Sequence, residues 1–255
     1  MIRIKNILSL TIMMASLHLY AYGQSLTDST KNKTVAAVNN EDQAENYRLH
    51  NNDWADLKYY QDDNKKLGVD KKDLVLLIGD SITELWGEID SSFFNANKNY
   101  VDRGISGQTT PQILLRFRQD VIDLKPKVVV ILAGTNDIAG NTGPATIEQI
   151  FGNLLSMIEL AKANHIKVVI CSLLPAFNYF WNEDIKPAGK SSMLKHKLKA
   201  YAALHHITYL DYHSSLKDYQ DGFKKNLTRD GVHPNIIGYK VMEPLLKNTL
   251  KSMGY

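Results

Sequence analysis

The fold is constrained most strongly by short apolar runs that alternate with longer amphipathic stretches. Residues 74–78 (LVLLI), 128–132 (VVVIL) and 168–171 (VVIC) carry no charged side chain, and residues 100–102 and 208–210 are shorter candidates. Strands covered on both faces of a parallel sheet are apolar throughout, whereas half-exposed strands alternate between apolar and polar residues. The runs therefore predict buried parallel strands.

Helical periodicity fills the intervals between these runs. Predicted helices cover residues 111–124, 146–164, 189–205 and 236–252, and a further helical pattern covers residues 46–67. Strands that alternate with helices predict an α/β fold in which helices cover both faces of a parallel sheet. A chain of 255 residues is long enough for one such domain with a sizeable core.

The N-terminus has the pattern of a secretory signal. Arg3 and Lys5 precede a mostly apolar stretch at residues 7–19, and the small residues Ala21 and Gly23 follow it. A basic start, a short apolar stretch and a small-x-small end are typical of a cleavable signal peptide. We therefore expect cleavage after Gly23 and secretion to the periplasm or the exterior.

The remaining chain divides by composition. We expect residues 1–23 to be the signal peptide, polar residues 24–45 a flexible linker, and residues 46–255 the domain. The apolar stretch is shorter than the about 20 residues that span a membrane, and the residue directly after Gly23 is Gln24, not a cysteine that could carry a lipid anchor. A stable membrane anchor is therefore not expected, and an uncleaved N-terminal anchor is the alternative.

Charge and cysteine content exclude several classes of protein. The formal net charge of +3 falls by two without Arg3 and Lys5, and no long run of Lys or Arg occurs. A nucleic-acid partner is therefore not expected. Cys171 is the single cysteine, so it cannot form an internal disulfide, and we expect it to be buried. Three histidines lack the carboxylate spacing of a metal site and are expected at a surface helix end: His205, His206 and His213.

Polar, glycine-containing blocks follow the predicted strands. In open α/β sheets, ligands bind beyond the carboxyl ends of the strands, so these blocks lie where a site is expected. The first three blocks follow three of the strands and the fourth opens the last helix: residues 79–83 (GDSIT), 104–110 (GISGQTT), 133–137 (AGTND) and 230–234 (DGVHP).

The blocks contain the groups that a serine hydrolase requires. A serine hydroxyl is a weak nucleophile and needs a base, a role that histidine fills because its ordinary pKa is near 6.5. A carboxylate must orient that imidazole and stabilise its charged form. Asp230 precedes His233 by three residues across a turn that contains Gly231, so its carboxylate can fold back onto the ring. Ser81 need only face this loop across the sheet edge.

The same blocks offer donors for a developing oxyanion. Ester cleavage builds negative charge on the carbonyl oxygen, and losing one donor to it typically costs about 3 kcal/mol of barrier stabilisation. The backbone N–H groups of Ser81 and Gly107 and the side-chain amide of Asn136 are the candidate donors. Glycine at position 107 would let a substrate approach the backbone closely.

Taken together, the blocks resemble those of the SGNH/GDSL hydrolase family. The resemblance covers roughly residues 46–250 and is closest to the secreted bacterial branch that is similar to platelet-activating-factor acetylhydrolase. It implies a three-layer, flavodoxin-like α/β fold with a five-stranded parallel sheet, and no metal or organic cofactor. It also implies the residue roles: Ser81 as nucleophile, Gly107 and Asn136 as oxyanion donors, His233 as base and Asp230 as the residue that orients it.

Two positions depart from the family pattern. Many members carry Asn where this chain has Asp102 and Gly where it has Ser106. Neither position is predicted to be catalytic, so the departures concern the geometry of the loop.

Each candidate residue also has a simpler interpretation. Ser81 could cap a helix, Asn136 and Gly107 could be turn residues, and the Asp230/His233 pair could cap the last helix. The segment around Gly107 lacks the third glycine of a dinucleotide fingerprint. Three other carboxylates are rivals for the acid of the triad, of which the first more plausibly orders the turn backbone: Asp80, Asp137 and Asp211.

Aromatic residues also follow the strand ends. Trp86 follows the nucleophile block, and Trp181 lies in an aromatic loop (residues 177–181) after the run at 168–171. Such rings could stack on a sugar or line an acyl pocket, or they could form a small satellite core. We single out Trp86 and Trp181 as candidate substrate contacts.

The sequence thus predicts a secreted serine ester hydrolase. We expect it to cleave short, acetyl-type esters of a carbohydrate or small alcohol, so its partner is a small-molecule or glycan ester. Two competing reactions would use the same site: lipid or phospholipid acyl hydrolysis, and acyl transfer to an acceptor other than water. A third possibility is a catalytically silent carbohydrate-binding scaffold. No oligomeric state is predicted.

Overall fold

The computed structural model describes residues 53–67, 73–182 and 184–255. The domain described below lies within the compact unit Ala55–Tyr255. The predicted signal peptide and linker, and the first part of the helix expected at 46–67, lie outside the described residues.

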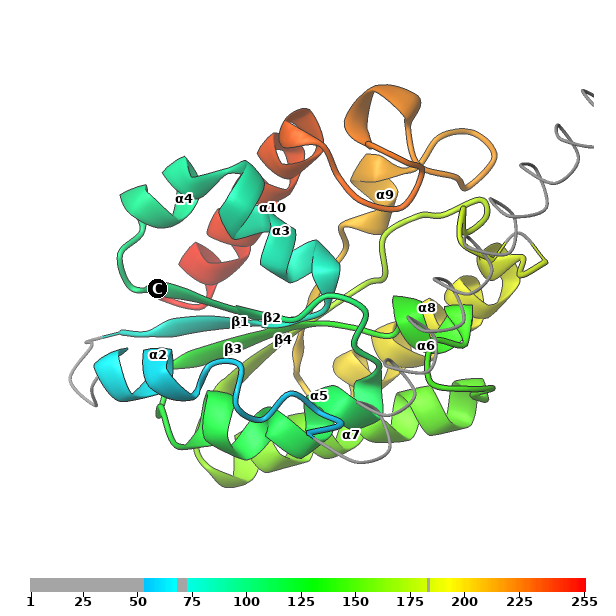
Figure 1. Cartoon of the computed structure of the whole chain (residues 1–255). Helices are drawn as coiled ribbons and strands as arrows, with labels where there is room; N and C mark the ends of the chain where they lie inside the picture. Colours follow the sequence, from blue (N-terminus) through cyan, green and yellow to red (C-terminus); the bar gives the residue numbers. More distant parts are fainter. Residues whose placement is uncertain (1–52, 68–72, 183) are drawn as a thin grey trace, which may run out of the picture. The chain divides into compact units, whose positions relative to one another are not determined.

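A five-stranded sheet with every strand parallel forms the centre of the domain (Figure 1). Its order, β2-β1-β3-β4-β5, is that of flavodoxin-like folds, so the expected fold class is confirmed. The central strands β1 and β3 are buried along their whole length, as their apolar runs predict. The strand bounds are β1 Val75–Gly79, β2 Tyr100–Gly104, β3 Val128–Leu132, β4 Lys167–Cys171 and β5 Thr208–Leu210.

Helices cover both faces of this sheet, which gives three layers (Figure 1). Alternate residues of each strand face opposite layers, so Leu76 and Ile78 pack in one apolar cluster while Val75 and Leu77 pack in the other. The first cluster includes α5 Thr110–Phe117, α7 Ile147–Ala163 and α8 Pro187–Leu204. The second includes α3 Ser81–Ile89, α4 Ser91–Ala96, α9 His213–Leu216 and α10 Ile236–Ser252.

Local hydrogen bonds decide where the helices near the sheet edge begin. The Asp80 carboxylate accepts from the Ile82 N–H at 3.0 Å and caps α3, while Thr109 and Gln112 form a reciprocal capping box at α5. Asn235 accepts from the N–H groups of Ile237 and Gly238 and caps α10. Asp80 and Thr109 lie within polar blocks and Asn235 directly follows one, so the blocks are held in place by the helices that they open.

Two helix predictions need correction. The helix expected at 111–124 is divided into α5 and a five-residue π-helical turn, η1 Arg118–Ile122. Of the helix expected at 46–67, the described residues are helical only in α2 Gln61–Leu67. The short elements α3, α4, α6 Thr135–Ala139, α9 and η2 Lys225–Leu227 were not predicted, because each is shorter than the window of about 11 residues over which helical periodicity is recognised.

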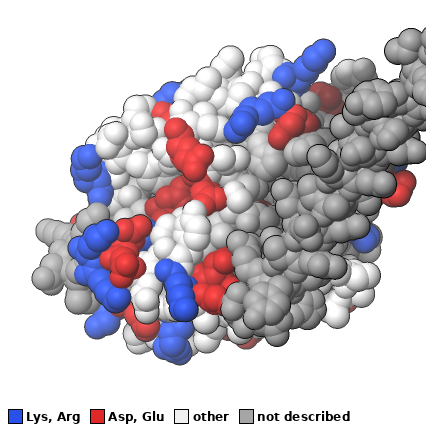
Figure 2. All heavy atoms as spheres, viewed as in Figure 1, with Lys and Arg blue, Asp and Glu red and all other residues white. Residues whose placement is uncertain are grey.

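Two surface properties complete the description. Within the described ranges, no helix is both long and apolar enough to span a membrane. On the face shown in Figure 2, acidic and basic side chains are both present, and neither sign covers the face alone.

Candidate active site

Three of the polar blocks meet at the carboxyl edge of the sheet. Ser81 is the first residue of α3, directly after β1 and its cap Asp80. Gly107 lies in the loop between β2 and α5, and Asn136 lies in α6, which follows β3. Since β1 pairs with both β2 and β3, the block that contains Ser81 lies between the block that contains Gly107 and the block that contains Asn136.

The fourth block brings a histidine onto Ser81. The Ser81 Oγ lies 2.9 Å from His233 Nε2, although the two residues are 152 positions apart. His233 Nδ1 lies 2.7 Å from Asp230 Oδ2. The His233 and Asp230 side chains are 15% and 28% exposed, so the pair is partly screened from water yet open to a substrate.

The Asp230/His233 pair is formed by its own loop. The second carboxylate oxygen of Asp230 accepts from the N–H groups of Val232 at 2.9 Å and His233 at 2.8 Å. The Thr228 hydroxyl donates to the His233 carbonyl at 2.8 Å and accepts from Gly231 N–H, whose φ of +89° suits glycine. The His233 ring and the Asp230 carboxylate are therefore preset by short-range bonds.

The same bonds keep the Asp230 carboxyl ionised. Partial burial by itself would raise the pKa of Asp230, but hydrogen bonds from the His233 backbone, the His233 ring and the Val232 backbone hold that pKa below its ordinary value. The carboxylate can therefore accept the Nδ1–H of His233 throughout the neutral range, which leaves Nε2 free to accept a proton from Ser81.

The rival carboxylates have other partners. Asp80 is buried and caps α3, and burial raises its pKa to about 6. Asp137 accepts from the backbone and hydroxyl of Thr110, and Asp211 accepts from Ser214. All three carboxylates therefore have bonds that hold neighbouring turns and helix starts.

The Asn136 amide is oriented by bonds on both of its ends. Its Nδ2 donates to the Gln108 carbonyl at 3.0 Å, and its Oδ1 accepts from Asn141 Nδ2 at 3.1 Å. Asn141 Nδ2 also lies 3.3 Å from the Gly107 carbonyl. Because an amide carries two N–H bonds and Gln108 takes one, the other can face a ligand.

The backbone at Gly107 borders open space. Its φ is +77°, and a Cβ built there would meet no atom within 4 Å. The Glu84 carboxylate accepts from the backbone N–H and the hydroxyl of Ser106 and so ties the preceding residue to α3. An incoming carbonyl group could therefore approach Gly107 without displacing a side chain.

The two tryptophans predicted to contact substrate have different surroundings. Trp181 is 38% exposed, and its ring centroid lies 6.2 Å from that of His233. It stacks on the buried Tyr179 at 4.9 Å, whose hydroxyl donates to the Thr135 carbonyl at 3.2 Å. Trp181 therefore lies at the rim of the site on a fixed support.

The prediction that Trp86 contacts substrate is wrong. Its side chain is 2% exposed and stacks between Phe93 at 4.9 Å and Tyr239 at 5.3 Å. Position 86 shares a face of α3 with Ile82 and Thr83, and that face packs on the sheet. Helical spacing thus places this ring in the core.

The remaining sequence predictions concern histidines and Cys171. Cys171 is buried as expected, and burial raises the pKa of its thiol. His205 and His206 are exposed near a helix end, whereas His213 is buried at the start of α9, which corrects that part of the prediction. Within the described part of the chain, no group of three or more His, Cys, Asp or Glu is arranged to hold a metal ion.

Buried polar residues behind the site were missed from the sequence. Gln108 is 1% exposed and Arg116 is fully buried, and they bond to each other beneath the oxyanion blocks. The available signal was Arg116 itself with Asp120 four residues later, a cation and a carboxylate on the same side of a predicted helix as Ile113 and Phe117. Its burial needed the tertiary structure.

Similarity to known proteins agrees with this geometry. The model of the GDSL-like Lipase/Acylhydrolase family matches residues 77–241, which include all four blocks. The chain belongs to this family. A GDSL-like lipase from Bacteroides thetaiotaomicron is 43% identical, with a TM-score of 0.75 over 78% of this chain and 98% of that structure.

Two curated relatives match this GDSL-family chain over shorter segments. The platelet-activating factor acetylhydrolase IB subunit alpha2 of Homo sapiens is 30% identical over 115 residues, which are 42% of this chain and 46% of that protein. A lipoprotein of Bacillus subtilis is 38% identical over 93 residues, which are 35% of this chain and 38% of that protein. The chain thus spans less than half the length of these two relatives.

Proposed function

We propose that the protein is a serine ester hydrolase in which Ser81, His233 and Asp230 form the catalytic triad. The observation that carries this proposal is the continuous hydrogen-bonded chain from Ser81 Oγ through His233 to Asp230 at the carboxyl edge of the sheet. The family description, lipase and acylhydrolase, names reactions that this arrangement can perform.

Acylation begins when Ser81 Oγ attacks the ester carbonyl carbon and its proton passes to His233 Nε2. The Asp230 carboxylate holds the Nδ1–H and stabilises the imidazolium that results. The carbonyl oxygen becomes an oxyanion, for which we propose three donors: the N–H groups of Ser81 and Gly107 and the free N–H of the Asn136 amide.

Collapse of this intermediate breaks the bond to the alcohol oxygen. His233 gives its proton to that oxygen, and the alcohol leaves an acyl group on Ser81. Water then donates a proton to His233 as it attacks the acyl carbon, and the second oxyanion uses the same donors. Release of the acid returns the proton to Ser81 and restores the starting state.

We propose short acyl esters, acetyl above all, as the substrates, with a carbohydrate or small alcohol as the other component. The name of the mammalian acetylhydrolase relative supports an acetyl group. The partly exposed ring of Trp181 beside His233 supports a sugar ring, because carbohydrate faces stack on aromatic rings. A lipid ester is the second candidate, favoured by the exposed rings of Phe177 and Phe180 nearby in the same loop.

Acyl transfer and silent binding are less well supported than hydrolysis. Transfer to a sugar or alcohol would use the same residues, and product analysis with and without an added acceptor separates it from hydrolysis. A silent carbohydrate-binding scaffold would not need a hydrogen-bonded Ser81, His233 and Asp230, which is why we favour catalysis.

We also propose that residues 1–23 direct secretion and are removed. The lipoprotein name of the Bacillus subtilis relative supports a location at the cell envelope. Intact mass and N-terminal sequencing of the exported protein test this, with Gln24 as the expected first residue. An unprocessed N-terminus would favour an uncleaved anchor instead.

The test of the catalytic proposal is hydrolysis of p-nitrophenyl esters of increasing acyl length, with Ser81→Ala as the control. We expect acetate to be cleaved fastest and the variant to be inactive. We also expect a serine-directed fluorophosphonate to label the wild type at Ser81 and not the variant. Preference for long chains would favour the lipid substrate, and an unlabelled, inactive wild type would favour the silent scaffold.

A further inference from the structure

Arg116 is a fully buried cation behind the candidate active site. It lies in the last turn of α5, a helix whose neighbouring residues Ile113 and Phe117 are core residues with no exposed surface. A guanidinium without partners would be strongly unfavourable there, since burial lowers the pKa of Arg116 by penalising its charge. Its partners therefore indicate what this buried cation does.

The guanidinium joins two of the four blocks directly. Its Nη2 donates to the Gly79 carbonyl at 2.9 Å, and its Nε donates to Gln108 Oε1 at 2.6 Å. Gly79 ends β1 two residues before Ser81, and Gln108 follows Gly107 directly. We call residues 79–81 the nucleophile turn and residues 105–108 the oxyanion loop.

Two further bonds extend this connection. The Gly79 carbonyl also accepts from the Ile105 N–H at 3.2 Å, and the Gln108 carbonyl accepts from Asn136 Nδ2 at 3.0 Å. Arg116 thus touches the nucleophile turn and the oxyanion loop, and it reaches Asn136 through Gln108. The Ser81 and Gly107 donors lie in the two segments that Arg116 contacts, and the Asn136 donor is one hydrogen bond away from Gln108.

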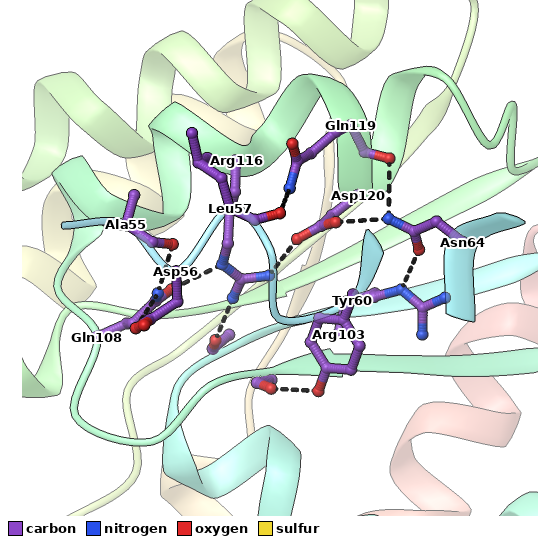
Figure 3. A network of polar contacts seen from close by, with 12 residues as sticks. Ala55, Asp56, Leu57, Tyr60, Asn64, Arg103, Gln108, Arg116, Gln119 and Asp120 are labelled. Atoms are coloured by element: carbon purple, nitrogen blue, oxygen red, sulfur yellow. Dashed lines mark hydrogen bonds and ion pairs between the residues drawn. The ribbon is translucent and has the colours of Figure 1, made fainter. Parts of the chain in front are cut away.

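Residues Ala55 and Asn64 bond to two partners of Arg116, namely Gln108 and Asp120 (Figure 3). Arg116 Nη1 bonds to Asp120 at 3.0 Å, and the other Asp120 oxygen accepts from Asn64 Nδ2 at 2.7 Å. Gln108 Nε2 donates to the Ala55 carbonyl at 2.9 Å. Ala55 and Asn64 lie before the residues that match the family model, 77–241, so part of this arrangement lies outside that match.

We propose that Arg116 is a positioning residue that sets the distance between Ser81 and the oxyanion donors. A guanidinium is a planar fork with donors at fixed angles, so it can fix two acceptors relative to each other. A lysine ammonium could neutralise Asp120 but lacks this rigid fork. Displacing a reacting group by about 1 Å can cost about 100-fold in rate, so a loosened fork should lower kcat.

The test is Arg116→Lys, measured with p-nitrophenyl acetate after fluorophosphonate titration of active sites. The inference rests on the proposed serine hydrolase. We expect kcat per titrated site to fall roughly 10- to 100-fold while KM stays within about twofold. A role in stability alone would reduce the number of titrated sites but leave kcat per site unchanged, which would overturn the proposal.

Arg103→Lys is the matched control. Arg103 is also a buried arginine, 4% exposed, and it bonds to Asn64 Oδ1 at 2.8 Å and to the Asp102 carbonyl at 2.6 Å. Because Arg103 makes neither of these bonds to Gly79 or Gln108, and connects to Arg116 through Asn64 and Asp120, we expect kcat per site within about twofold of wild type. An equal fall in both variants would indicate general loosening and overturn the positioning role.

A second variant decides the case if Arg116→Lys does not fold. Gln108→Met keeps the volume of the side chain but removes the acceptor of Arg116 Nε, and we expect roughly a 10-fold fall in kcat per site. An unchanged kcat per site in this variant would overturn the proposal. A wild type that is inactive and unlabelled would instead overturn the serine hydrolase assignment and the positioning role together.

Discussion

The loop that carries His233 and the region that carries the oxyanion donors are built in opposite ways. In the histidine loop, the bonds that shape Asp230 and His233 join residues no more than five positions apart. In the oxyanion region, Gly79, Gln108 and Asn136 each have at least one bond to a residue 28 to 53 positions away. A locally built pair can be recognised in a sequence, whereas a remotely held one needs the fold.

The largest effect should come from breaking the local pair without disturbing its loop. In Asp230→Asn, the amide oxygen can keep the bonds from Val232 and His233 N–H, but its NH₂ then faces His233 Nδ1. The ring is pushed into the wrong tautomer, so kcat should fall by about 10³- to 10⁴-fold. Steady-state kinetics with p-nitrophenyl acetate measure this, and an unchanged Tm confirms that the loop persists. A fall of less than tenfold would exclude Asp230 as the acid.

A smaller effect should follow from removing one remote donor. Asn136→Ala deletes the oriented amide, and we expect kcat to fall by about 10²- to 10³-fold with little change in KM. The remaining donors at Ser81 and Gly107 should preserve some activity. If KM rises and kcat does not change, Asn136 binds the ground state and is not an oxyanion donor.

Asn141 should have a still smaller effect, because it orients Asn136 without touching the oxyanion. We expect Asn141→Ala to lower kcat about 10-fold, since Asn136 Oδ1 and the Gly107 carbonyl lose a shared donor. Adding Asn141→Ala to Asn136→Ala should then produce almost no further loss. If the fold-losses in kcat of the two single variants multiply in the double variant, Asn141 acts independently of Asn136. Asn164→Ala is the control. It removes a similar exposed amide at the C-terminal end of α7, where the side chain bonds to the Leu160 carbonyl.

Trp181 tests whether the rim of the histidine loop selects the substrate. With an acetylated sugar, Trp181→Ala should raise KM about three- to tenfold, because the sugar face loses its aromatic partner. With p-nitrophenyl acetate, kcat should change less than twofold, since Trp181 lies beside His233 without a hydrogen bond to it in the described geometry. An unaltered KM with several esters would remove Trp181 from the proposed site.

Strand β2, which leads into the oxyanion loop, should also carry a stability cost that the histidine loop does not. Burial raises the pKa of Asp102 to about 7, and its Oδ2 has no hydrogen-bond partner within the described residues. Because the folded-state pKa lies above the unfolded value of about 3.9, stability is lost as pH rises from about 4 to 7. Asp102→Asn, which removes the charge, should therefore raise the free energy of unfolding by about 2–4 kcal/mol at pH 8 and hardly at pH 4.

Calorimetry at the two pH values checks this prediction. We expect Tm to increase by about 4–10 °C at pH 8. The exposed Asp62→Asn is the control and should not raise Tm at either pH, because the Asp62 carboxylate lies in water and pairs with Lys65. An equal increase at pH 4 and pH 8 would mean that packing, and not the buried charge, explains the gain.

Much of the fold could be predicted because it depends on local pattern. The apolar runs located all five strands to within two residues, and the periodic stretches located α7, α8 and α10. The prediction failed where burial overrode pattern. Trp86 follows the nucleophile turn in sequence, but its position on α3 turns the ring toward the sheet and away from the site.

By itself, the sequence determined which polar blocks follow which strands, and it determined the Asp230-x-x-His233 pair that its own loop can shape. The tertiary structure alone decided that Arg116 lies between Gly79 and Gln108, and that the Asn136 amide bonds to the Gln108 carbonyl. The physical reason is the range of the forces involved. Periodicity and short hydrogen bonds act over a few residues, whereas a buried cation is stable only where distant acceptors converge on it.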